Sequence, residues 1–407
     1  MATSAALSNI AKYVFPKDMP HAFYDMNPGL GDWKKVTDDE GESYRYTVAT
    51  SQGAVGSALY ATAYTVAGNV QYTRFTLTRI TDYAIARMNG EDYEALQSQE
   101  AAVVGAWKDR VETAYEECKR SLAIMSFRDG SGNRGRIGTS GLSGATITLL
   151  VTSTITNFYV GMSLTACATT TGTIEGGSEI VAQIDRQNGT LTSTDASWAT
   201  GIPTIANSDY LFRNGDGQNG GSRVVLTGLG SLLTGGSTPG TLWGANRNID
   251  PVALAGTSKS YATYALDEAV LDLAQLVSIQ STEKKVLYAN PRDKVELIKL
   301  LESKARFMRP AQGDDAKVGF ENVEFSTDSG PMILKGDVNV PQYSFFITPP
   351  ERVELRSVGP APKPLKVDGQ LVRARDAYDA YEMRLGSYAA MAHRFPAAGG
   401  QGTSWGQ

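Results

Sequence analysis

Between Glu91 and Phe127 the sequence carries a helical repeat that is too long for a compact domain to enclose. Apolar side chains recur every three or four residues along it: Val104, Trp107, Val111, Ala114, Cys118, Leu122 and Met125. At about 1.5 Å per residue this helix would be roughly 50 Å long, with one apolar face. It needs a long surface to lie on. Because the repeat lasts only about three heptads, a sheet is a better partner than a coiled coil.

The chain before this helix also predicts elements that are not stable alone. Residues 41–90 contain two alternating runs, "SYRYTVAT" and "VQYTRFTLTRIT", separated by a small, apolar segment. This pattern predicts a long two-stranded hairpin, which is only marginally stable in water by itself. Prolines and glycines punctuate residues 1–40 between single large side chains such as Trp33. These residues are expected to form an arm that is either disordered or held on another surface.

The segment after the helix changes composition twice. Residues 143–212 are rich in threonine and poor in charge, and Asn188-Gly189 is typical of a tight hairpin turn, so a small β-barrel or sandwich is expected here. The remainder reads as mixed α/β. It contains an amphipathic helix in "TYALDEAVLDLAQLVSIQ", a buried strand in "KKVLYANP", a second helix in "RDKVELIKLLESKARFM" and further strands.

One motif suggests a nucleotide site. Gly130-Ser-Gly-Asn-Arg-Gly135 matches the glycine fingerprint of dinucleotide-binding folds, which needs a strand before the loop and a helix after it. Here the order is reversed, because the long helix precedes the loop and the strand-like "ATITLLVTSTI" follows. We interpret these glycines as the end of the helix and a sharp turn of the chain.

Composition and motifs indicate no enzyme site. The two histidines, His21 and His393, and the two cysteines, Cys118 and Cys167, form no cluster with metal-ligand spacing, so catalytic, cofactor-binding and metal residues are predicted to be none. A GxSxG pattern at 402–406 lies at the very end of the chain, where no nucleophile elbow can form. With a net charge of −5, no signal peptide and no long apolar run, the expectation is an intracellular protein without a membrane span that contacts nucleic acid weakly at most.

The order of these elements resembles the major capsid proteins of tailed bacteriophages, the Hong Kong 97-type fold. "Arg128-Asp-Gly-Ser-Gly-Asn133" is similar to the loop that ends the spine helix in that family, and "Val286-Leu-Tyr-Ala-Asn-Pro291" to a strand and helix start of its axial domain. "Gly240-Thr-Leu-Trp-Gly-Ala-Asn-Arg247" is similar to the segment leading into that domain, and the run 379–388 to its returning strand. The resemblance covers nearly the whole chain.

The resemblance implies an α+β capsid fold with an added all-β insertion. The implied divisions are an N-terminal arm (1–40), an extended hairpin loop (41–90), the spine helix and glycine loop (91–142), the inserted β-barrel or sandwich (143–220), an axial α/β domain (221–365), return strands of the peripheral domain (366–395) and a flexible tail (396–407).

The resemblance also implies function and partners. Copies would assemble as pentamers and hexamers into the icosahedral shell around double-stranded DNA, within a virion made in the bacterial cytoplasm. A separate scaffolding protein, a portal and a decoration protein would be partners, and contact with packaged DNA would be weak. Residues 41–90 contain no lysine, so the family's lysine–asparagine crosslink cannot form from this loop. Inter-subunit contacts are instead predicted at Trp33, Arg45, Arg74, Arg79 and Arg87.

Three alternatives remain open at this point. The shell of an encapsulin-type nanocompartment would share the fold but enclose enzymes. A carbohydrate-binding surface protein would account for the threonine-rich β segment, but it would be expected to carry a signal peptide. A hydrolase would need the catalytic cluster that the sequence does not show.

Overall fold

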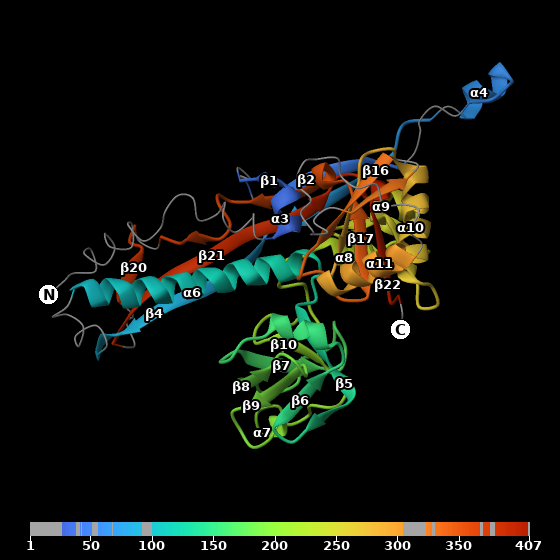
Figure 1. Cartoon of the computed structure of the whole chain (residues 1–407). Helices are drawn as coiled ribbons and strands as arrows, with labels where there is room; N and C mark the ends of the chain where they lie inside the picture. Colours follow the sequence, from blue (N-terminus) through green and yellow to red (C-terminus); the bar gives the residue numbers. More distant parts are fainter. Residues whose placement is uncertain are drawn as a thin grey trace, which may run out of the picture.

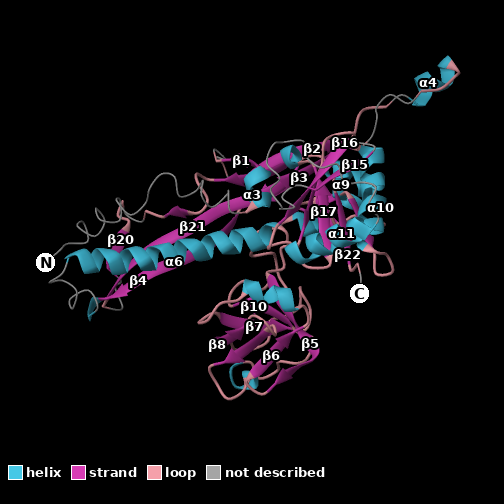
Figure 2. Ribbon diagram, in the orientation of Figure 1, coloured by secondary structure: helices cyan, strands magenta, loops and turns pink. Residues whose placement is uncertain are grey.

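The computed structural model describes residues 27–37, 41, 43–50, 56–66, 68–91, 100–303, 323–327, 330–366, 369–374 and 379–405. Figure 1 shows a long sheet with a helix along it, a helix-covered sheet at one end, a closed barrel beside the helix and a projecting hairpin. The secondary structure in Figure 2 makes the separation of these parts clear.

The long sheet is built around β21 (Ala380–His393). Its other strands are β1 (Lys34–Val36), β4 (Ile80–Asn89), β18 (Val353–Ser357), β19 (Lys363–Pro364) and β20 (Val372–Ala374). β4 runs antiparallel to β21 along its full length. The prediction of one hairpin over 41–90 is therefore wrong for β4, because that strand pairs with a partner from the other end of the chain. Alternation predicts a strand but does not specify which strand it pairs with.

The long helix α6 (Glu100–Ser126) covers one face of this sheet. Trp107, Val111 and Cys118 of the helix pack in one core cluster with Met383 and Leu385 of β21. The apolar stripe thus lies on a sheet, as the periodicity predicted. Glu91, where the prediction begins, is also helical, and residues 92–99 of the predicted range lie outside the described residues.

The second sheet has strand order β13-β22-β17-β14-β16-β15. These strands are β13 (Thr257–Ser260), β22 (Gly400–Thr403), β17 (Ser344–Thr348), β14 (Val286–Ala289), β16 (Gly330–Gly336) and β15 (Val323–Thr327). Helices α10 (Leu266–Gln280) and α11 (Pro291–Ser303) pack on one face. Short elements complete this part: α8 (Leu229–Leu232), β11 (Thr241–Leu242), β12 (Ala245–Asn246), η2 (Arg247–Ile249), α9 (Pro251–Ala255), η3 (Pro350–Arg352) and η4 (Pro396–Ala398).

The C-terminal segment is the clearest correction to the sequence analysis. The predicted flexible tail forms η4 and then β22, which lies inside the sheet between β13 and β17. A Cβ on Gly402 would lie 2.3 Å from the ring of Phe345. The glycines of this segment therefore allow close backbone approach, and do not make the tail flexible.

The inserted part is a closed barrel with strand order β10-β5-β6-β9-β8-β7. Its strands are β5 (Asn133–Ser143), β6 (Thr146–Leu149), β7 (Ser163–Cys167), β8 (Glu179–Asp185), β9 (Thr190–Ser193) and β10 (Tyr210–Arg213), with η1 (Thr152–Asn157) and α7 (Trp198–Gly201) between them. Its core holds residues of the barrel alone, among them Ile137, Phe158 and Trp198. The barrel therefore has its own apolar core.

The boundary of the barrel differs from the prediction. The segment after Gly132 was read as loop up to residue 142, yet it is β5, the first barrel strand. Glycines are needed there for space, because a Cβ on Gly141 would lie 2.3 Å from the carbonyl oxygen of Thr148. Gly130 and Gly132 do turn the chain after α6, with φ values of +81° and +87°.

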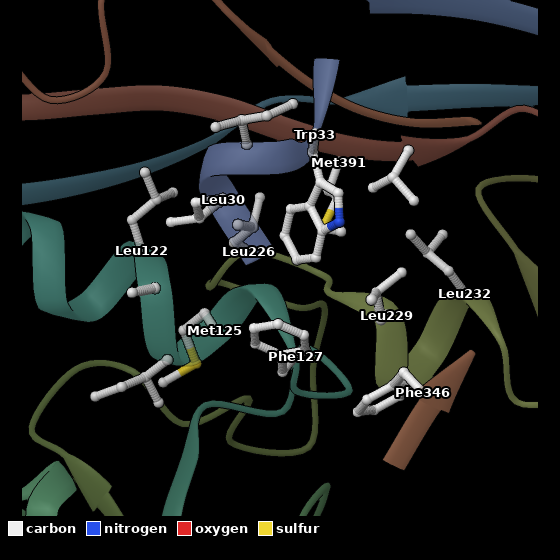
Figure 3. Close-up of a cluster of buried hydrophobic side chains, with 14 of the residues drawn as sticks. Leu30, Trp33, Leu122, Met125, Phe127, Leu226, Leu229, Leu232, Phe346 and Met391 are labelled. Atoms are coloured by element: carbon white, nitrogen blue, oxygen red, sulfur yellow. The ribbon is translucent and has the colours of Figure 1, made fainter. Parts of the chain in front are cut away.

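The arm preceding β1 contributes to the core. α3 (Pro28–Asp32) and Trp33 pack among side chains of both sheets and of α6, including Phe127 and Met391 (Figure 3). Trp33 is 2% exposed. The prediction that Trp33 contacts another subunit is therefore wrong, because the chain's own core leaves none of its surface free.

The buried His393 predicts a pH dependence of stability. It is fully buried at the end of β21, with Nε2 2.8 Å from Oγ1 of Thr348. Burial, and then the charge of Arg352, lower the pKa of His393 from 6.5 to about 3. Between these values the unfolded chain binds a proton that the folded chain does not. The free energy of unfolding should therefore fall as pH drops from 6.5 to 3, by up to about 1.4 kcal/mol per pH unit from this residue.

Urea denaturation of the wild type and His393→Gln at several pH values between 7 and 3.5 measures this contribution. The variant should lose less stability per pH unit than the wild type over this range. Identical pH slopes in the two proteins would contradict the assignment.

Candidate assembly surfaces

The hairpin is the first surface that the fold leaves partly unsatisfied. β2 (Ser43–Ala49) and β3 (Tyr72–Thr78) pair antiparallel from Ser43 opposite Thr78 to Ala49 opposite Tyr72, which confirms the predicted pairing of these two strands. Alternate residues of the two strands point to opposite faces. The inward side chains Tyr46, Val48, Phe75 and Leu77 form a cluster with Ala390 and Ala392 of β21. The base of the hairpin thus covers one end of the long sheet, on the face opposite α6.

A buried carboxylate fixes this base. The side chain of Glu354 on β18 is 1% exposed and lies 3.5 Å from Lys34, 2.9 Å from Arg356 and 2.8 Å from Arg394. The Arg356 guanidinium lies 3.4 Å from the ring centroid of Tyr44 on β2, and Arg394 donates a 3.2 Å hydrogen bond to the Tyr44 hydroxyl. The hairpin is therefore joined to the sheet by charge as well as by apolar packing.

Beyond its base the hairpin leaves the body of the molecule. Residues 50–71 contain no charged side chain, and α4 (Tyr60–Val66) stands far from the sheets (Figure 1). Leu59, Tyr60 and Tyr64 are 68%, 85% and 76% exposed, and the two tyrosine rings stack with centroids 6.5 Å apart. We call residues 56–66 the tip. Large apolar side chains this exposed, held together on an uncharged segment, mark a contact surface.

The long sheet leaves a second apolar surface. Ala84, Ala86 and Met88 of β4 face α6, so the alternate residues Tyr83 and Ile85 point to the opposite face. These two side chains are 51% and 55% exposed. The hairpin base does not reach this half of β21, where Tyr388 meets Tyr83 edge to face at 6.1 Å. We call this region, residues 81–87 with 382–388, the open half of the sheet.

Charged groups lie on the same face of the open half, because Arg87, Glu382 and Arg384 alternate in step with Tyr83, Ile85 and Tyr388. Glu382 is 5% exposed and accepts hydrogen bonds from Arg373 and Arg384 at 3.3 and 2.7 Å. Burial raises the pKa of Glu382, but these arginines outweigh it and the net pKa is lowered. Glu382 therefore stays ionised, and its negative charge offsets part of the positive charge of Arg373 and Arg384.

The structure places the predicted contact arginines in different surroundings. Arg45 and Arg74 lie diagonally across the exposed face of β2 and β3. Arg79 is half-buried and donates to the carbonyl oxygen of Gly41. Arg87 lies on β4, and its carbonyl oxygen accepts a 2.7 Å hydrogen bond from Arg110. Arg45 and Arg74 thus form one surface, while Arg79 and Arg87 are apart from it.

Sequence reasoning missed the open half of the sheet and the carboxylate of Glu354. Alternation in "TDYAIARMN" could have indicated which side chains of β4 share a face, but not that this half of the sheet stays uncovered. Among the described residues, no group of three or more His, Cys, Asp or Glu side chains could hold a metal ion. Within the same part of the chain, no helix is long and apolar enough to cross a membrane.

Comparison with known proteins supports the fold. A chain of the cyanophage A-1(L) capsid asymmetric unit is 10% identical, with a TM-score of 0.52, and the match covers 94% of this chain and 93% of that one. The chain has a phage capsid protein fold. The expected Hong Kong 97-type architecture is thereby confirmed. At this identity the likeness concerns the fold alone.

Other solved structures are similar at lower scores. The capsid of a native GTA particle is 11% identical, with a TM-score of 0.45, and the match covers 92% of this chain and 89% of that one. The holo-SrpI encapsulin complex of Synechococcus elongatus PCC 7942 is 8% identical, with a TM-score of 0.43, covering 93% and 88%. No protein-family model matches the sequence, and no curated protein sequence matches it either.

The buried carboxylate gives a prediction for the capsid fold. Glu354→Gln keeps the size of the side chain but removes the buried negative charge that Lys34, Arg356 and Arg394 contact. The free energy of unfolding should fall by about 2–3 kcal/mol, and amides of β2 and β3 should exchange faster. Glu351→Gln, three residues away and exposed, is the matched control and should change stability by less than about 0.5 kcal/mol. Equal losses in the two variants, measured by urea denaturation, would rule out this role for Glu354.

Proposed function

We propose that the chain is the major capsid protein of a tailed bacteriophage and assembles as pentamers and hexamers into the icosahedral shell around double-stranded DNA. The observation that carries this proposal is a capsid-protein fold over nearly the whole chain, with two surfaces whose large apolar side chains the described residues leave exposed. The role is structural and not enzymatic. The proposed location is the virion capsid, after synthesis in the bacterial cytoplasm.

The tip and the open half expose similar side chains, but they lie too far apart to contact each other within one molecule. The tip is uncharged and apolar, the open half exposes Tyr83 and Ile85 beside charged side chains, and both surfaces carry exposed tyrosines. In Figure 1, α4 and the outer end of β4 lie at opposite ends of the molecule, so the tip does not reach its own sheet. The tip of one copy therefore packs on the open half of the next, and closed rings follow when this head-to-tail contact repeats.

The remaining parts have proposed roles within this shell. Residues 221–365 would form the axial domain that meets around the ring centre, residues 366–395 the return strands, and the barrel a surface domain. A scaffolding protein, a portal and a decoration protein are proposed as further partners. With a net charge of −5, the chain would contact packaged DNA weakly and without sequence preference.

Replacing the tip side chains tests the proposal most simply. The triple variant Leu59→Ser, Tyr60→Ser and Tyr64→Ser should fail to form rings or shells, because the three side chains are exposed in the single chain and buried only between copies. Its free energy of unfolding should match the wild type within about 0.5 kcal/mol. Electron microscopy and light scattering of the co-expressed chain and scaffolding protein measure assembly.

The control carries three equivalent changes on the barrel, Leu150→Ser, Val160→Ser and Ile180→Ser, and should still assemble. Shells formed by the tip variant would refute the proposed contact. A wild-type chain that stays a monomer at all concentrations would refute the capsid role itself. Particles filled with protein cargo instead of DNA would favour the encapsulin alternative.

Arg45 and Arg74 are proposed to pair with acidic groups of the neighbouring copy. Their face of the hairpin is exposed and carries no acidic side chain among its described residues. Replacing both with Gln should raise the protein concentration needed for assembly by roughly two- to fivefold per lost pair at low salt. In high salt the difference from the wild type should shrink, because screening weakens the wild-type pairs. Arg186→Gln on the barrel is the control, and an equal effect in that variant would contradict the proposed pairs.

A further inference from the structure

The attachment of the barrel to the rest of the chain differs from every other contact between parts. The five apolar clusters of the described residues include one made only of barrel residues, and the other four contain none from 133–213. No apolar core in this part of the chain therefore crosses from barrel to body. In Figure 1 the barrel stands off from the helix and is joined to it at one side.

Charged side chains lie where the barrel meets α6 and the long sheet. Arg213, at the end of β10, lies 2.6 Å from Asp82 on β4 and 3.1 Å from Glu117 on α6. It also lies 2.9 Å from Asp216. Arg134 of β5 is fully buried, 3.8 Å from Glu117 and 3.5 Å from Asp216. We call these five residues the ionic junction.

The ionic junction takes charged groups out of water, which is unfavourable unless each charge keeps its partners. Burial lowers the pKa of Arg134, and the neighbouring charge of Arg213 lowers it further. Burial also raises the pKa of Asp216, against the opposing effect of Arg213. Removing one partner from such a group leaves the others buried and unpaired, which destabilises the contact far more than losing a surface ion pair.

Both connections to the barrel pass this point and both contain backbone that glycine favours. On entry, Gly130 and Gly132 have positive φ, and on exit Gly215 and Gly220 do, with φ of +92° and +71°. A Cβ on Gly132 would lie 2.3 Å from the carbonyl oxygen of Asp216, so entry and exit run side by side. Entry and exit therefore lie together, so a rotation of the barrel would need backbone changes at this one place.

An open cavity lies beside the two connections. A cavity of about 1290 Å³ lies between α6, the edge strand β4 and residues 213–216. Asp82, Glu117 and Arg213 are among its lining residues. Polar contacts also bridge the two parts, among them the hydrogen bonds that Arg120 of α6 donates to the carbonyl oxygen of Thr156 and that Arg134 donates to the Ser121 hydroxyl at 3.4 Å.

We propose that the barrel is a movable domain held in one orientation by the ionic junction, and that it rotates about residues 130–132 and 214–220 when this contact is broken. Arg213 is the main contact, because it reaches both β4 and α6. The inference concerns the single chain and does not depend on shell formation.

Distance measurement between spin labels in the full-length chain tests the proposal. Labels at Gln187→Cys on the barrel and Lys108→Cys on α6 occupy exposed positions, while Cys118 and Cys167 are buried. The wild type should give one narrow distance distribution. Arg213→Met should broaden it at least about twofold and add longer distances, and linker amides 214–222 should exchange at least about tenfold faster.

Two further variants make the outcome decisive. Arg186→Met removes an exposed arginine from the same barrel and should behave as the wild type. Asp82→Asn lies outside the barrel, so it removes a partner of Arg213 without changing the barrel sequence. If the barrel amides of Arg213→Met exchange faster than in the wild type, that variant has a damaged barrel, and the result for Asp82→Asn is the one that counts. A distribution as narrow in Asp82→Asn and Arg213→Met as in the wild type would overturn the proposal, and so would a broad distribution in the wild type.

Discussion

The long sheet has two faces, and the described residues cover one of them and about half of the other. α6 packs along one face through the cluster of Trp107, Val111 and Met383. On the other face, the base of the hairpin covers the end of β21 near Ala390, and the half around Tyr83 and Ile85 stays exposed. Exposed apolar side chains gathered on one sheet face are typical of an interaction surface. The same chain has an apolar tip that stands away from its own sheet, and under the proposed function contact between copies would bury both.

The parts are joined in different ways, and this sets what can move. The two sheets share the apolar core around Trp33, Phe127 and Phe346. The hairpin base is held by apolar packing and by the carboxylate of Glu354. The barrel is joined through charges and glycine turns instead. Apolar packing is non-directional and is spread over many side chains, so the loss of one side chain leaves the contact in place. A buried ionic contact depends on each charged partner, and removing one of them destabilises it strongly.

Local pattern predicted the local elements. The 3.6-residue repeat gave the spine helix, alternation gave β2 and β3, and composition indicated the inserted β domain. Apart from the start of the barrel, where a predicted loop forms β5, the errors concern contacts between distant residues. Glycines at 399, 400 and 402 indicated a flexible tail, but they allow close packing against Leu233, Val277 and Phe345 respectively. Trp33 was expected at a subunit contact, yet it lies against Phe127, ninety-odd residues away in the chain. Of the candidate surfaces, the hairpin was predictable and the open half was not, because the partner of β4 is a strand near the other end of the sequence.

A cryo-electron microscopy map of the assembled particle, at a resolution that traces the chain, tests the central claim most directly. The account predicts that residues 56–66 of each copy lie on the open half of the sheet of the next copy, with Tyr60 and Tyr64 buried against Tyr83 and Ile85. Particles in which the tip points to solvent, or folds back on its own chain while the open half remains exposed, would contradict it.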